Sequence, residues 1–249
     1  MADSLAIVLA AGKGTRMESD LPKVLVPACG RPMIDYVLDV LARLQFNRIL
    51  VVVGFKAELV RETLGSRGNI EFVDQTEQLG TGHAVQVCRD QLTTHEGPVL
   101  VVTGDSPLIQ ESSLRKIMHL YDDEHPHCIL GTLIKDDPTG LGRIVRDDQG
   151  QFLAIVEQKD ATGDQQRINE VNMSTYLFEC QDLLAALDQL RNDNNQSEYY
   201  ITDCPGILKS IGKDVRALPV LQPCEASSVN NLADLQAVEA ELRKHPCES

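Results

Sequence analysis

The first half of the sequence alternates short apolar runs with segments of helical periodicity. The apolar runs that predict strands are Leu5–Leu9, Arg48–Val53, Ile70–Val73, Val99–Thr103 and Ile129–Ile134. The segments between them that predict helices are Met33–Leu44, Lys56–Leu64, Gly82–Arg89 and Ser112–Asp122. Because predicted strands and helices alternate along the sequence, the pattern favours βαβ units with right-handed crossovers. We therefore expect an α/β fold with a Rossmann-like, mostly parallel sheet flanked by helices.

The second half of the sequence has a different pattern, which predicts a small antiparallel insertion. Gly142–Asp147 and Phe152–Glu157 flank Asp148-Gln-Gly150, a combination typical of a hairpin. Further strands are expected at Val171–Phe178 and Val215–Leu218, and helices at Asp182–Leu190, Ile201–Ile211 and Leu232–Lys244. Pro205 is compatible with its helix only in the first turn.

Charge and cysteine content narrow the function classes. The formal net charge of −14 argues against nucleic acid or an anionic membrane as a partner. No apolar run approaches membrane-spanning length, and no basic stretch precedes an apolar one as in a signal peptide. The seven cysteines are odd in number and form no C-x-x-C pair, which favours reduced thiols and a cytoplasmic protein.

A loop of small residues and cations follows the first strand, with the sequence Ala10-Ala-Gly-Lys-Gly-Thr-Arg-Met17. Small residues let a ligand approach the backbone, and exposed N–H groups in such a loop form an anion-binding concavity. Lys13, Arg16 and Lys23 add positive charge to a chain that is otherwise acidic. The loop therefore predicts a bound polyphosphate, and a tight turn with incidental charge is the alternative.

The same loop does not fit a dinucleotide-binding fingerprint. Met17 stands where the third glycine of that fingerprint belongs, and Gly54 follows the second strand where a ribose-binding carboxylate is expected. The Walker pattern of P-loop proteins is absent from the sequence as well. These departures argue against a dehydrogenase.

Two other strand ends carry polar side chains suited to a nucleotide. Asp105 follows the fourth strand, where a carboxylate near a phosphate loop suits Mg²⁺, or alternatively caps a turn. Gln75 follows the third strand and offers both a donor and an acceptor to the edge of a base. Thr81 is expected to cap the helix that begins near Gly82, and His83 is interpreted as structural.

Polar residues also interrupt the apolar strands of the second half. Gly142, Glu157, Asn172 and Asn230 lie on or beside these strands. They point either into a pocket or toward solvent, and periodicity does not decide between the two.

Taken together, these segments resemble the sugar-1-phosphate nucleotidyltransferases. The resemblance begins with Leu9–Met17 and Leu21–Leu25, which look like the signature of that family. Further segments are similar to the uridyltransferase half of the bacterial bifunctional N-acetylglucosamine-1-phosphate uridyltransferases, namely Gln78–Ala84, Gly104–Leu108, Gly142–Val145, Ile155–Ala161, Glu198–Asp203 and Val229–Asn231. The similar segments follow one another in order from about Ala6 to Glu239.

The resemblance implies a role for each matching position. A uracil base would be held by Leu9, Ala10, Ala11, Gly12, Gln75, Gly80 and Thr81, and Thr103 and Gly104 would also contact substrate. Arg16 and Lys23 would contact the phosphates, and Asp105 and Asn230 would bind Mg²⁺. The sugar pocket would be shaped by Gly142, Glu157, Asn172 and Asn230, with Tyr199, Tyr200 and Thr202 in its wall. Arg16, Lys23 and Asp105 would be the catalytic residues.

The resemblance also implies the organisation of the chain. Residues 1–249 would form a single nucleotidyltransferase domain, with a nucleotide-binding half at about 1–110, a sugar-binding half at about 111–230, and a C-terminal helix and tail at 231–249. We expect no acetyltransferase domain, and therefore no acetyl transfer. The chain departs from the family pattern where Val26 replaces a histidine, Met173-Ser174 replaces Thr-Gly, and Ser228 replaces a glycine.

The expected reaction forms UDP-N-acetylglucosamine and pyrophosphate from UTP and N-acetylglucosamine 1-phosphate with Mg²⁺. The same chemistry with another sugar 1-phosphate or nucleotide, such as glucose 1-phosphate with UTP, is one alternative. A non-catalytic regulatory subunit that binds a sugar nucleotide is another. The sequence leaves the oligomeric state open, a homo-oligomer included.

Overall fold

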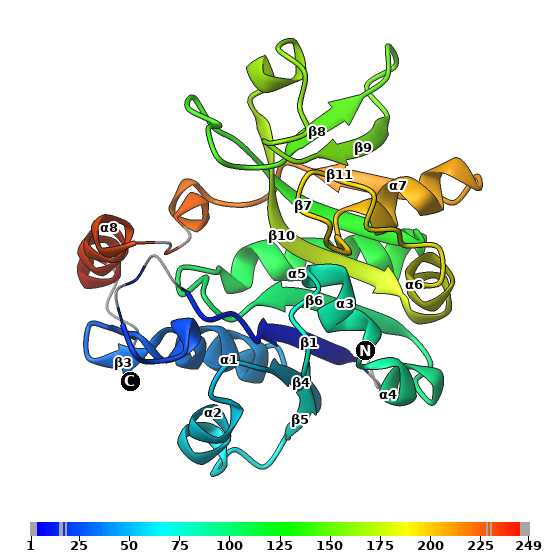
Figure 1. The fold of residues 1–249 in the computed structure, drawn as a ribbon. Helices are drawn as coiled ribbons and strands as arrows, with labels where there is room; N and C mark the ends of the chain where they lie inside the picture. Colours follow the sequence, from blue (N-terminus) through cyan, green and yellow to red (C-terminus); the bar gives the residue numbers. More distant parts are fainter. Residues whose placement is uncertain (1–3, 15–16, 18, 228, 230, 245–249) are drawn as a thin grey trace.

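The computed structural model describes residues 4–14, 17, 19–227, 229 and 231–244. Within these residues, the strands form a nine-stranded sheet and a separate two-stranded hairpin (Figure 1). Seven strands follow the order β11-β7-β10-β6-β1-β4-β5. Their bounds are Leu5–Ala10 for β1, Arg48–Val53 for β4, Ile70–Asp74 for β5, Pro98–Thr103 for β6, Cys128–Ile134 for β7, Glu170–Glu179 for β10 and Val215–Leu218 for β11.

Six of these seven strands run in one direction, and β10 lies antiparallel between β6 and β7. The predicted hairpin is formed by β8 (Arg143–Arg146) and β9 (Phe152–Val156), and β8 joins the sheet by pairing with β10. The expected fold class, a mostly parallel sheet with a small antiparallel part, is confirmed. The reversed direction of β10 was not foreseen.

Helices cover both faces of the sheet, which explains why the strands read as continuous apolar runs. On β1, Leu5 and Ile7 are buried in the core beneath one set of helices, while Ala6 and Val8 are buried in the core of the opposite face. The first face is covered by α3 (Thr81–Gln86), α4 (Arg89–Thr93), α6 (Cys180–Leu187) and α7 (Asp203–Ser210). The second is covered by α1 (Met33–Arg43), α2 (Ala57–Leu64) and α5 (Glu111–Glu124).

The remaining elements are short or peripheral. Helix α8 (Leu232–Lys244) packs beside the hairpin of β2 (Pro27–Ala28) and β3 (Arg31–Pro32) through a separate apolar cluster (Figure 1). Three turns of 3-10 helix are η2 (Lys23–Leu25), η3 (Gln165–Arg167) and η4 (Pro223–Ala226). The strands β2 and β3 are too short for sequence periodicity to reveal.

The helix predicted over Gly82–Arg89 is wrong in its extent, because the chain bends between α3 and α4. The Cys88 N–H bonds the carbonyl of Val85, three residues back, instead of continuing the α-helical pattern. Val85, Cys88 and Leu92 are all buried in the same core. The bend lets both short helices follow the surface of the sheet. Pro205 lies in the first turn of α7, as predicted.

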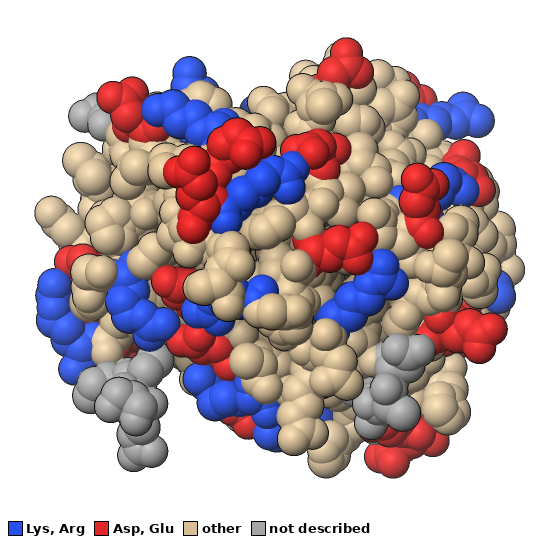
Figure 2. Space-filling view, turned by 90° about the horizontal axis from the view of Figure 1, so that it is seen from below, with Lys and Arg blue, Asp and Glu red and all other residues tan. Residues whose placement is uncertain are grey.

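Within the described residues, no helix combines the length and the apolar character that crossing a bilayer requires. On the face seen in Figure 2, basic side chains lie beside acidic ones instead of gathering in a patch of one sign.

Candidate functional site

A cavity of about 260 Å³ opens at the carboxyl ends of β1, β5 and β6. Such strand ends are where parallel α/β sheets bind ligands. Its lining includes Leu9, Ala10, Ala11, Gly12, Lys23, Gln75, Gly80, Thr81, Thr103 and Asp105. The fold therefore brings together residues that the sequence places on three separate loops. Gly104 lies directly beside them, and its N–H donates to the Leu9 carbonyl.

The glycine loop after β1 folds back on itself. Gly14 has φ +65°, and a Cβ at this position would lie 2.8 Å from the Cβ of Lys23. Only glycine allows this close approach in the left-handed region. Among the described residues, apart from the chain neighbours of Gly12, no atom lies within 4 Å of where a Cβ on Gly12 would stand, so its backbone is accessible to a ligand. Arg16 lies outside the described residues.

Lys23 and Asp105 form an ion pair that borders the cavity. The Lys23 Nζ lies 2.5 Å from an Asp105 carboxylate oxygen, and the two side chains are only 16% and 20% exposed. In the described part of the chain, the Asp105 carboxylate contacts the Lys23 ammonium. None of the contacts described for this carboxylate caps a turn, which was the alternative role. A positive and a negative group stand side by side where phosphates and a metal are expected.

The donor chemistry at Asp105 fits Mg²⁺. Magnesium takes oxygen ligands and usually only one or two from protein, with phosphates and water completing the octahedron. Asp105 supplies a carboxylate to the cavity. In the part of the chain that the structure describes, no group of three His, Cys, Asp or Glu side chains forms a metal cage. Asn230, the second expected ligand, lies outside the described residues.

Gln75 is held by contacts that determine which of its atoms is left for a ligand. Its side chain is 3% exposed, and Nε2 donates to the Gly80 carbonyl at 3.0 Å and lies 3.1 Å from the His83 Nδ1. With Nε2 engaged, Oε1 remains as a hydrogen-bond acceptor. His83 therefore supports Gln75, a contact that sequence reasoning did not identify.

The expectation that Thr81 caps its own helix is wrong. Helix α3 begins at Thr81 without a side-chain cap, and the Thr81 hydroxyl accepts a hydrogen bond from the Ile201 N–H at 3.2 Å. The Gly82 N–H donates to the Tyr199 carbonyl at 2.7 Å. A Cβ on Gly80 would lie 2.5 Å from that same carbonyl. The segment around Tyr199 thus fastens the loop before α3, a long-range contact that no local pattern contains.

Three residues expected in the sugar pocket lie together. A Cβ on Gly142 would be 3.4 Å from the Glu157 Oε1 and 3.6 Å from the Asn172 Cβ. Asn172 is 6% exposed, so it does not belong to a solvent face. Burial raises the pKa of Glu157, and a hydrogen bond with Thr202 opposes that shift. The pairing of β8, β9 and β10 thus brings Gly142, Glu157 and Asn172 together, and their role in a sugar pocket stays a prediction.

Arg143 is a buried residue of this region that sequence reasoning missed. Its side chain is among the largest fully buried ones and is 1% exposed. The guanidinium donates to the Leu141 carbonyl and to the Gln158 Oε1, the latter at 2.7 Å. These partners are the chain neighbours of Gly142 and Glu157, so Arg143 links the start of β8 to the segment that follows β9, beside these two residues. The signal in the sequence was an arginine that directly follows Gly142 at the start of the predicted strand.

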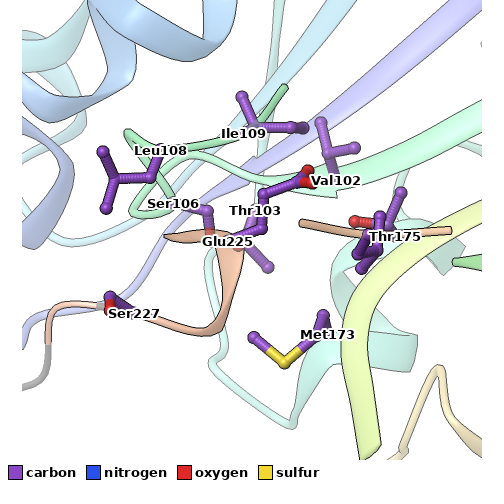
Figure 3. Close-up of a pocket in the computed structure, with 10 residues that line it drawn as sticks. Val102, Thr103, Ser106, Leu108, Ile109, Met173, Thr175, Glu225 and Ser227 are labelled. Carbon is purple, nitrogen blue, oxygen red and sulfur yellow. Dashed lines mark hydrogen bonds between the residues drawn. The ribbon is translucent and has the colours of Figure 1, made fainter. Parts of the chain in front are cut away.

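Figure 3 shows a second, small cavity of about 10 Å³ beside the first. Thr103 lines both cavities, and its hydroxyl lies 2.8 Å from that of Ser106. Met173 and Thr175 of β10 and Glu225 of η4 complete the small cavity, which has room for about one water molecule. Thr103, the last residue of β6, is therefore shared by the two cavities, and Met173, the chain neighbour of Asn172, lines the small one.

The buried carboxyl of Asp203 should make the stability of the fold depend on pH. Burial raises its pKa to about 6, with Asp160 and Asp193 adding to the shift. A carboxyl whose pKa is higher in the folded chain than in the unfolded chain destabilises the fold when ionised, and this penalty fades as the pH falls. We expect Asp203→Asn to raise the unfolding midpoint at pH 8 by about 2–4 °C.

The gain from Asp203→Asn should be clearly smaller at pH 4.5 than at pH 8, because pH 4.5 lies below the folded-state pKa of about 6. It should vanish only below the ordinary aspartate pKa of about 3.9, where the carboxyl is protonated in the unfolded chain as well. Thermal unfolding of both proteins at the two pH values measures it. The exposed Asp123→Asn serves as the control and should have little effect at either pH. An equal gain at pH 8 and pH 4.5 would contradict the elevated pKa.

Comparison of the sequence with known proteins shows the family of this chain. Residues 6–200 match the model of the MobA-like NTP transferase domain. A bifunctional protein GlmU of Shouchella clausii is 43% identical over 98% of this chain and 53% of its own length. A bifunctional protein GlmU of Listeria welshimeri is 44% identical over 93% of this chain and 50% of its own length. The chain spans about half the length of these relatives.

A solved structure agrees with the fold. UDP-glucose pyrophosphorylase complexed with UDP-glucose superposes with a TM-score of 0.78 over 97% of this chain and 99% of that chain. At 16% identity this likeness concerns the fold alone. The family model covers most of the sequence, including the strands that carry the cavity. The chain therefore belongs to the MobA-like NTP transferase domain family.

Proposed function

We propose that this protein transfers a uridylyl group from UTP to N-acetylglucosamine 1-phosphate, forming UDP-N-acetylglucosamine and pyrophosphate. The observation that carries the proposal is the cavity at the ends of β1, β5 and β6, where an open glycine backbone, Lys23 and Asp105 meet. The similarity to the bifunctional GlmU proteins supports the choice of sugar and nucleotide. In this proposal residues of about 1–110 hold the nucleotide and residues of about 111–230 hold the sugar.

The reaction joins two anions without a protein nucleophile. An oxygen of the sugar 1-phosphate attacks the α-phosphorus, the bond to the β-phosphate oxygen breaks, and pyrophosphate leaves with that electron pair. The attacking oxygen is already ionised near neutral pH, because the second pKa of a phosphate monoester is about 6. Catalysis is then a matter of positioning and of offsetting negative charge.

The residues of the cavity suit these two tasks. The backbone around Gly12 approaches the nucleotide closely, and the Lys23 ammonium stabilises charge that develops on the phosphates. Asp105, together with Asn230, would hold Mg²⁺, which when bound neutralises phosphate charge and orients the reacting groups. In our proposal Arg16 adds a second cation from the glycine loop.

The orientation of Gln75 supports a preference for uracil. Because Nε2 is engaged by Gly80 and His83, the Oε1 is the atom of the amide that would accept a hydrogen bond from the base. The N3 position of uracil is a donor, whereas the N3 of cytosine is an acceptor. Gln75 thus offers uracil the partner that it needs and cytosine the wrong one.

We expect Gln75→Ala to lower the preference for UTP over CTP, measured as the ratio of kcat/KM values, by about 10-fold or more. Gln86→Ala is a matched control, since Gln86 donates to the main-chain oxygen of Leu187 outside the cavity. That control should leave the ratio unchanged. A Gln75→Ala protein with the wild-type ratio would remove base recognition from this residue.

Pyrophosphate release over a matrix of nucleoside triphosphates and sugar 1-phosphates tests the proposal directly. We expect the highest kcat/KM for the pair of UTP and N-acetylglucosamine 1-phosphate. Highest kcat/KM for glucose 1-phosphate would change the sugar but keep the chemistry. Binding of UDP-N-acetylglucosamine without pyrophosphate release from any pair would identify a sugar-nucleotide-binding subunit instead of an enzyme.

A further inference from the structure

A buried tyrosine lies next to the sugar-side residue Asn172. The Asn172 Nδ2 donates to the Tyr176 hydroxyl at 2.7 Å. Tyr176 is fully buried in β10, opposite Val101 of β6 and Leu130 of β7, and its ring lies 5.8 Å from that of Phe178. Such packing holds the ring in one place. The Tyr176 hydroxyl is therefore a hydrogen-bond partner with a fixed position for the Asn172 amide.

An irregularity of β10 makes this contact reachable. In a regular strand, residues four apart are separated by about 13 Å. Here Asn172 lies opposite Thr132 of β7 while Thr175 lies opposite Gly131, the neighbouring position of β7. Met173 and Ser174 thus bulge from the ladder, and Asn172 and Tyr176 are separated by about two strand steps, roughly 7 Å. A tyrosine side chain spans that distance.

The bulge also fixes the other end of the Asn172 amide. Ser174 adopts φ +54°, a left-handed conformation that costs free energy for a residue with a Cβ. In this conformation the Ser174 N–H donates to the Asn172 Oδ1 at 3.3 Å. The amide is therefore held at Nδ2 by Tyr176 and at Oδ1 by the bulge. Beyond these two contacts among the described residues, the amide has one further N–H and one further lone pair to offer a partner.

Asn172 and Glu157 both lie next to Gly142. The Asn172 Cβ and the Glu157 Oε1 both lie within 3.6 Å of the Cβ position of Gly142. An oriented amide beside a carboxylate is suited to a neutral polar substituent, such as a hydroxyl or an acetamido group on a sugar ring. We infer that Tyr176 is a positioning residue whose hydroxyl orients Asn172 to recognise such a substituent of the sugar 1-phosphate. This inference rests on the proposed function.

Tyr176→Phe removes the hydroxyl and keeps the ring in the core. We expect it to raise the KM for N-acetylglucosamine 1-phosphate by about 10-fold, near the upper end for one neutral hydrogen bond, and to leave the KM for UTP within about twofold. Tyr121→Phe is the matched control, since Tyr121 is also buried and its hydroxyl bonds Glu179 on the far part of β10. The control should change neither KM.

A double-mutant cycle separates positioning from general support of the fold. If Tyr176 acts through Asn172, then Asn172→Ala/Tyr176→Phe should have the same KM for the sugar phosphate as Asn172→Ala alone. Thermal unfolding of each variant confirms that the proteins compared are folded. The inference would be overturned if the double variant raised the KM for the sugar phosphate by the product of the two single effects. It would also be overturned if Tyr176→Phe raised the KM for UTP as much as the KM for the sugar phosphate.

The outcome also distinguishes this inference from the proposed function. A wild-type protein that releases no pyrophosphate with these substrates overturns both. An active wild-type protein whose Tyr176→Phe variant keeps the wild-type KM for the sugar phosphate overturns only the role of Tyr176.

Discussion

Asp105→Asn should reduce kcat by about 10²-fold or more, because it removes the carboxylate that would hold Mg²⁺ next to the phosphates. The change conserves size and leaves β6 intact. It also removes the partner of Lys23, whose Nζ lies 2.5 Å from the carboxylate. Since an amide oxygen is a weaker ligand for a dication than a carboxylate, raising the Mg²⁺ concentration should restore part of the lost turnover.

Measuring kcat over a Mg²⁺ titration checks this prediction. Asp74→Asn is the matched control, because Asp74 lies at the carboxyl end of a parallel strand, as Asp105 lies just after one, and also pairs with a cation, Arg61, at 2.6 Å. Asp74 does not line the cavity. The control should keep the wild-type titration curve. Wild-type turnover of Asp105→Asn at every Mg²⁺ concentration would exclude a metal role for Asp105.

Lys23→Ala should slow turnover by about 10²-fold, which is typical when a preorganised charge at a reacting centre is lost. The ammonium is only partly exposed, so its attraction to phosphate is screened less than that of a surface lysine. Its removal also leaves the Asp105 carboxylate facing the phosphates without its partner. We therefore expect the kcat to fall more than the thermal stability.

The kcat and the unfolding midpoint of Lys23→Ala, measured together, test this expectation. Lys213→Ala provides the comparison, since Lys213 pairs with the largely buried Asp182 at 2.8 Å on the far side of the fold. That variant should keep its kcat. A Lys23→Ala protein with nearly normal turnover would exclude this ammonium from the mechanism.

Local sequence signals were sufficient for most elements of the fold. The runs at Leu5–Leu9 and Arg48–Val53 became parallel strands because both of their faces are buried, which requires uninterrupted apolar residues. The hairpin around Gly150 followed from its turn residues. The break between α3 and α4 was missed, since it depends on burying Cys88 against the sheet and not on a helix-breaking residue.

The candidate site was predictable to a similar degree. Strand ends and glycines indicated that Gly12, Gln75 and Asp105 would meet at one edge of the sheet, and they line one cavity. The roles assigned from family resemblance remain predictions, and Arg16 and Asn230 lie outside the described residues. The true partner of Thr81 was not predictable, because Ile201 lies far away in the sequence.

The sequence by itself determined the class of fold, the glycine loop and the set of strand ends where we expect a ligand to bind, because apolar periodicity and turn residues act locally. Only the tertiary structure decided that β10 runs against its neighbours and bulges at Ser174. It likewise decided that Lys23 meets Asp105 and that Tyr176 reaches Asn172. Those contacts arise from strand register and close packing, which depend on segments far apart in the chain.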